Sequence, residues 1–145
     1  MHVSSQKSPV ARHWTQKLYL GVASLILIGI VSEGLLIGPS LFATTHWGRA
    51  VHGYIGVLLL LLALLLPVAG RLARQSSRMI ILSAVLPVLT LIEVTSAVLG
   101  KRTPLLAAIH PANALLMIGL TVLLLIQEQH LMRERRDEMI PSLDQ

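Results

Sequence analysis

The stretch Trp47-Gly-Arg-Ala-Val-His52-Gly-Tyr-Ile-Gly56 runs directly into an apolar block at residues 57–68. It places a histidine just inside a long hydrophobic segment. A basic residue, Arg49, lies three positions before the histidine, and Gly56 lies four positions after it. A helix needs about 20 apolar residues to cross the hydrocarbon core of a bilayer. Residues 47–70 therefore predict a membrane-spanning helix with a histidine near one end.

The composition extends this interpretation to the whole chain. Hydrophobic residues make up 54% of the 145 residues, and charged residues only 13%. Three further apolar runs, at residues 18–38, 79–100 and 104–127, also have the length of membrane spans. Short connections make consecutive helices antiparallel neighbours. The sequence therefore predicts an all-α fold, an integral membrane up-down-up-down four-helix bundle at residues 18–127, in contact with the lipid bilayer.

The basic residues predict the orientation of this bundle. Of the 12 Lys and Arg residues, nine fall on the side of the termini: Lys7, Arg12, Lys17, Arg71, Arg74, Arg78, Arg133, Arg135 and Arg136. The other three are Arg49, Lys101 and Arg102. Because Lys and Arg are enriched in cytoplasmic loops, we expect residues 1–17 and 128–145 to be cytoplasmic tails, the second of them helical. We expect a multi-pass protein of the plasma membrane, whose basic residues serve topology and not nucleic-acid binding.

A second stretch of the chain repeats the plan of the first. Two basic residues, Lys101 and Arg102, precede the segment His110-Pro-Ala-Asn-Ala114, which leads into another apolar run. The residue at i+4 shares the face of the histidine one turn deeper in the helix. It is Gly56 in the first stretch and Ala114 in the second, so both histidines have a small residue beneath them.

Each histidine also has a carboxylate in the span before it. The offsets between the halves are 93 − 33 = 60 for the glutamates and 110 − 52 = 58 for the histidines, so the chain is predicted to be two repeated helical hairpins. At a rise of about 1.5 Å per residue, Glu33, His52, Glu93 and His110 all fall about 7–10 Å from the outer helix ends. An ionisable residue in a bilayer is costly without a partner inside the bundle. We therefore expect these four residues to form one functional layer.

Two histidines on facing helices fit the ligand set of a bis-histidine heme. The chain has no cysteine, which excludes thiolate ligands and thioether-attached heme. The expected cofactor is therefore a heme that is not covalently attached, with His52 and His110 as iron ligands. Small side chains beneath them leave room for the macrocycle, and basic residues at the rim could pair with its propionates. These further cofactor contacts are Gly56, Ala114, Arg49, Lys101 and Arg102.

Three roles remain open for Glu33 and Glu93. They could accept the Nδ1–H of the ligating histidines and so fix the ring orientation. They could be protonated carboxyls that line a proton path, or neutral acids that hydrogen-bond between helices.

The segments Ile30-Val-Ser-Glu33-Gly34 and Leu91–Gly100, together with the two histidine motifs, resemble one four-helix half of the heme A synthase family. The segment His110–Ala114 is also similar to one in small uncharacterised bacterial four-helix membrane proteins. The resemblance implies a four-helix bundle and bis-histidine b-type heme binding by His52 and His110. The chain has one bundle and lacks the outer-loop cysteine pair of many synthases, so heme binding is carried over and heme oxidation is not.

The expected function is that of a small membrane b-type cytochrome with its heme near the outer face. It would exchange electrons with a redox partner protein or a quinone. It could be an electron-transfer subunit or an oxidoreductase, and we assign no catalytic residue. Two alternatives stay open. The Glu/His layer could serve a proton or metal transporter or a metal site, or the chain could be an accessory subunit of a larger membrane complex or a homo-oligomer.

Overall fold

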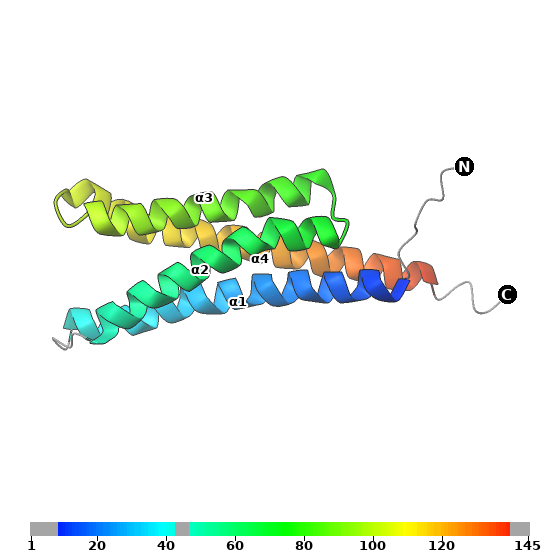
Figure 1. Cartoon of the computed structure of the whole chain (residues 1–145), viewed down its shortest axis with the longest axis horizontal. Helices are drawn as coiled ribbons and strands as arrows, with labels where there is room; N and C mark the ends of the chain where they lie inside the picture. The colour runs from blue at the N-terminus through cyan, green and yellow to red at the C-terminus, as the bar shows by residue number, and fades with distance from the viewer. Residues whose placement is uncertain (1–8, 43–46, 140–145) are drawn as a thin grey trace.

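The computed structural model describes residues 9–42 and 47–139, and every element in these ranges is an α-helix. The four helices are α1 (Pro9–Phe42), α2 (Trp47–Leu72), α3 (Ser77–Leu99) and α4 (Pro104–Met139) (Figure 1). Within the described ranges there is no β-strand, so the predicted all-α class is confirmed.

The helices pack in the order of the chain. Helix α1 packs against α2, α2 against α3, α3 against α4, and α4 closes the ring against α1. The backbones of the diagonal pairs, α1 with α3 and α2 with α4, do not approach each other closely, so these helices meet only through side chains. The beginning of α1 and the end of α4 lie at the same end of the molecule (Figure 1). This is the predicted up-down-up-down four-helix bundle, built from the hairpins α1–α2 and α3–α4.

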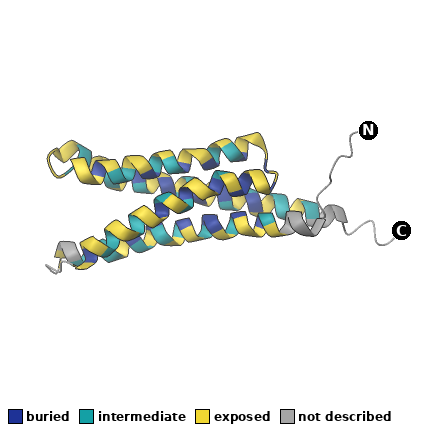
Figure 2. Cartoon of the chain, viewed as in Figure 1, coloured by how far each residue is buried: buried dark blue, intermediate teal, exposed yellow. Residues whose placement is uncertain are grey.

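The outer surface of the bundle is apolar. Four segments are long and apolar enough to cross a membrane, namely Trp14–Pro39, Trp47–Leu72, Ser77–Leu99 and Pro104–Arg135. In each, at most 28% of the most apolar stretch is buried, and exposed positions run along all four helices (Figure 2). Surface helices of a soluble protein would present polar residues there. The chain is therefore a multi-pass membrane protein in contact with lipid.

Two helices extend beyond the predicted spans. Residues 9–17, which the sequence assigns to a tail, belong to α1. Pro9 is its first residue, a position that suits proline because the first turn needs no N–H donor. The helix also continues past Pro39 to Phe42, since the missing N–H costs only one bond in the last turn. Helix α4 runs without a break from its span to Met139.

The turn between α2 and α3 has a defined geometry. Arg74 has a φ of 55°, the left-handed conformation that commonly ends a helix. The Arg74 N–H donates to the Arg71 carbonyl at 3.1 Å, and the Gln75 N–H donates to the Gly70 carbonyl at 3.0 Å. These two bonds form a Schellman motif. Ser76 then caps α3 by accepting a bond from the Met79 N–H at 3.3 Å.

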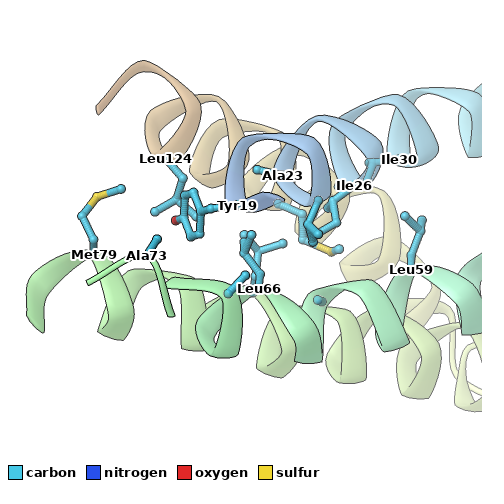
Figure 3. Close-up of a cluster of buried hydrophobic side chains, with 14 residues drawn as sticks. Tyr19, Ala23, Ile26, Ile30, Leu59, Leu66, Ala73, Met79 and Leu124 are labelled. Carbon is cyan, nitrogen blue, oxygen red and sulfur yellow. The ribbon is translucent and has the colours of Figure 1, made fainter. Parts of the chain in front are cut away.

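The apolar core lies in the half of the bundle where α1 begins and α4 ends. Tyr19, Ala23, Ile26, Leu66 and Leu124 are fully buried there (Figure 3). Toward the opposite end the hairpins α1–α2 and α3–α4 diverge (Figure 1), and buried positions become sparse (Figure 2). The diverging half holds the predicted Glu/His layer.

Candidate functional site

Glu33 and His52 form the first pair of the layer. Glu33 lies on α1 with a side chain almost fully buried, and His52 lies on the antiparallel neighbour α2 and is half-buried. The His52 Nδ1 atom is in direct contact with Glu33 Oε2. The other carboxylate oxygen, Glu33 Oε1, is buried and has no hydrogen-bond partner. A charged or polar partner is thus placed at Nδ1 of His52.

Glu93 and His110 form the second pair, between α3 and α4. The His110 Nδ1 atom lies 3.1 Å from Glu93 Oε1 and 3.1 Å from the Glu93 backbone carbonyl oxygen. The side chain of Asn113 donates to Glu93 Oε2 at 2.6 Å and to the Leu89 carbonyl at 2.9 Å. Asn113 therefore holds Glu93 in position. Asn113 was not among the predicted site residues.

The two pairs meet across the bundle. The ring centroids of His52 and His110 lie 5.9 Å apart, with the ring planes at 71°. These rings come from α2 and α4, which lie diagonally and whose backbones do not approach each other closely. In each ring Nδ1 faces a glutamate, and within the described ranges no hydrogen bond or ion pair reaches Nε2. Each histidine therefore keeps one ring nitrogen available for another ligand.

Small residues lie one turn deeper than each histidine. Gly56, one turn deeper than His52, is half-buried, yet a Cβ atom built on it would meet no atom within 4 Å. Ala114 is half-buried one turn deeper than His110. Arg49, Lys101 and Arg102 are exposed near the diverging ends of the two hairpins.

This geometry suits imidazole as a metal ligand. When the Nδ1–H of a histidine donates to a carboxylate or carbonyl, the ring is held in the tautomer that has its lone pair on Nε2. Both histidines have such an acceptor. Among the described residues, no group of three or more His, Asp or Glu side chains is arranged to hold a metal ion by itself.

A second buried acid lies at the other end of the bundle. Glu128 on α4 is fully buried and contacts Gln75 of the α2–α3 turn, although the sequence assigns residues 128–145 to a tail. The signal that could have identified it is helical spacing. Asn113, Met117, Thr121 and Leu124 recur on the buried face of α4, and Glu128 continues their period.

Comparison of the chain with protein-family models, with curated proteins and with solved structures gives no match in any of the three.

Proposed function

We propose that this chain is a small membrane b-type cytochrome that holds heme b between His52 and His110. The observation that carries the proposal is the separation of the two rings. Two imidazoles that each bond a metal at about 2 Å place their ring centroids about 6 Å apart. The centroids of His52 and His110 lie 5.9 Å apart and belong to diagonally opposite helices.

The surroundings of the rings support the same proposal. The open space at Gly56 and the small side chain of Ala114 provide room for a flat macrocycle between the diverging hairpins. Arg49, Lys101 and Arg102 lie toward the helix ends, where their charges would pair with propionates. The unbonded Nε2 atoms are the groups that would hold the iron.

Heme would supply one-electron chemistry, and two histidine ligands from the protein would favour electron transfer over oxygen activation because they leave no site for oxygen on the iron. Glu33 and Glu93 would act through the histidines, by holding a negative charge at each Nδ1–H. The partner is a redox protein or a quinone. The resemblance to one half of the heme A synthase family belongs to this proposal, as bis-histidine binding without the synthase reaction.

The placement of the heme follows from the charge distribution. Of the 11 basic residues in the described ranges, eight lie at the end where α1 begins, α4 ends and the α2–α3 turn is found. The positive-inside rule assigns that end to the cytoplasm and the Glu/His layer to the outer half of the plasma membrane. Electrons would then be exchanged close to the outer surface.

The test is the absorption spectrum of the protein purified in mild detergent, oxidised and then reduced with dithionite. We expect a sharp Soret band and separate α and β bands after reduction. His52→Ala and His110→Ala should each lose this six-coordinate spectrum. His130→Ala is the matched control, since His130 is 73% exposed and pairs only with Glu134 one turn away. Unchanged spectra in both histidine variants would reject the assignment.

A second candidate is a proton or metal site in the same layer. It is favoured by the two direct Glu–His pairs and by the unpartnered Glu33 Oε1 atom. The two candidates differ in what heme-free protein does. A metal or proton site predicts bound zinc or iron by elemental analysis, or ion flux in vesicles, from colourless protein. A cytochrome predicts neither.

A further inference from the structure

Glu128 is a buried carboxyl that the proposed heme site does not use. Its side chain is fully buried in α4, at the end of the bundle where α1 begins. One oxygen, Oε2, is contacted by the side-chain amide nitrogen of Gln75, and the other, Oε1, has no hydrogen-bond partner. Burying an ionised carboxylate oxygen without a hydrogen-bond donor destabilises the folded protein, so the ionised form of Glu128 is disfavoured here.

The fold places Gln75 against Glu128 by means of a specific turn. Gln75 follows the left-handed residue Arg74 and closes the Schellman motif at the end of α2. At this position of the motif an apolar side chain commonly packs back on the helix. Here the position is taken by a buried glutamine, whose Oε1 atom also lacks a partner. The turn therefore brings a donor and an acceptor to the carboxyl.

The other helices line the same level with polar groups. The Tyr19 hydroxyl of α1 shares a 2.7 Å hydrogen bond with the Ser83 hydroxyl of α3, and both side chains are fully buried. Of the titratable groups on these elements, Arg135 acts electrostatically on Glu128, and Glu128 in turn acts on Tyr19. Arg78 of α3 is exposed, beside His130 and Glu134 on the surface. In the described ranges no ion pair joins Glu128 to Arg135, and Arg135 Nη1 is buried without a partner.

We propose that Glu128 is a proton-binding site at the end of the bundle opposite the histidines, and that Gln75 serves as its partner in both protonation states. The ionised carboxylate accepts a bond from the Gln75 amide N–H. The protonated carboxyl donates its O–H to the Gln75 amide oxygen once the amide has turned over, because an amide carries both a donor and an acceptor. The proton comes from water at the end of α4 and returns there. This proposal goes beyond the cytochrome function and does not depend on it.

Infrared difference spectroscopy of the full chain in detergent, between neutral and alkaline pH, tests the proposal. The wild type should show the C=O stretching band of a protonated carboxyl that disappears as pH rises. Glu128→Gln should remove the part of the band that Glu128 contributes, even if Glu33 and Glu93 contribute too. Glu134→Gln is the matched control, because Glu134 lies on the same helix and is 55% exposed. A wild type without a titrating band, or a band identical in Glu128→Gln, would overturn the proposal.

A second variant keeps the test decisive if Glu128→Gln does not fold. Gln75→Leu removes the donor to the ionised form, which is the stronger of the two bonds. The band should then persist to a higher pH than in the wild type. If Gln75 had only a structural role, the band would disappear at the same pH in Gln75→Leu as in the wild type. That result would show that Gln75 is not the partner of Glu128 in proton binding. Neither infrared measurement needs heme, so both can test the Glu128 proposal even on protein that binds no heme.

Discussion

His52 and His110 face each other across the bundle at a centroid separation of 5.9 Å, although the backbones of α2 and α4, which carry them, do not approach each other closely. Each is held from outside the pair by a glutamate on the preceding helix. The neighbours α1 and α3 thus position two rings on α2 and α4. A ligand bound between the two rings would need both rings held in fixed positions, and the glutamates provide this.

Charge at the glutamates should set the redox potential of the proposed heme. Glu33→Gln keeps an acceptor near His52 Nδ1 but removes the negative charge. Loss of that charge disfavours the oxidised iron, so the midpoint potential should rise by about 60 mV, the equivalent of a tenfold change for a one-electron couple. Glu93→Gln should act in the same direction. Spectroelectrochemical titration measures both, with the exposed Glu134→Gln as control; a fall in potential would contradict this role.

The open space at Gly56 should be needed for the cofactor and not for the fold. A Cβ atom there meets nothing within 4 Å, so Gly56→Leu should fold normally and fill the space meant for the macrocycle. We expect heme content to fall about tenfold, which is the size of the loss in metal affinity when a residue that supports a metal site is changed. Gly53→Leu is the control, because Gly53 is exposed and equally open. Equal heme content per folded protein in both variants would show that Gly56 does not line the site.

Two glycines should respond oppositely to alanine. A Cβ atom on Gly100 would lie 2.9 Å from the Ala107 Cα atom and 3.0 Å from its backbone nitrogen, so α3 and α4 would have to separate. Gly100→Ala should therefore reduce the free energy of unfolding by about 1–3 kcal/mol. Gly34→Ala, which meets nothing within 4 Å, should be neutral or stabilise α1 by up to about 1 kcal/mol. Denaturant unfolding in detergent, followed by circular dichroism, compares them; equal stabilities would disprove the close approach.

Topology is a separate prediction that needs no cofactor. Alkaline phosphatase fused after Lys101 should be active, because we expect the α3–α4 turn outside. The same enzyme fused after Gln145 should be inactive, because the basic C-terminal end should stay in the cytoplasm. The reverse pattern of activities would place the Glu/His layer in the inner half of the membrane.

The helix number and the Glu/His layer could be predicted from the sequence for physical reasons. A span must be long and apolar, so each helix is visible in hydropathy alone. Charged residues within a span need partners, so Glu33, His52, Glu93 and His110 were predicted to lie together. The structure brings each glutamate to one histidine, and the two histidines to each other. That these residues bind heme stays a prediction.

The Glu128 site could not be predicted in the same way. Glu128 begins a charged stretch, and hydropathy alone assigns such a stretch to solvent. It is buried because the α2–α3 turn, with Gln75, and α1, with Tyr19, pack around this part of α4. The contact with Gln75 depends further on the left-handed Arg74, whose conformation the sequence does not signal by a glycine. Both features depend on tertiary packing.

The most direct measurement is the dithionite-reduced minus oxidised absorption spectrum of the purified wild type, His52→Ala, His110→Ala and His130→Ala proteins. A cytochrome with these axial ligands predicts a low-spin b-type spectrum in the wild type and in His130→Ala, and its loss in each of the other two. A wild type that stays colourless when heme is supplied during expression would contradict the account, as would a low-spin spectrum that survives in both His52→Ala and His110→Ala.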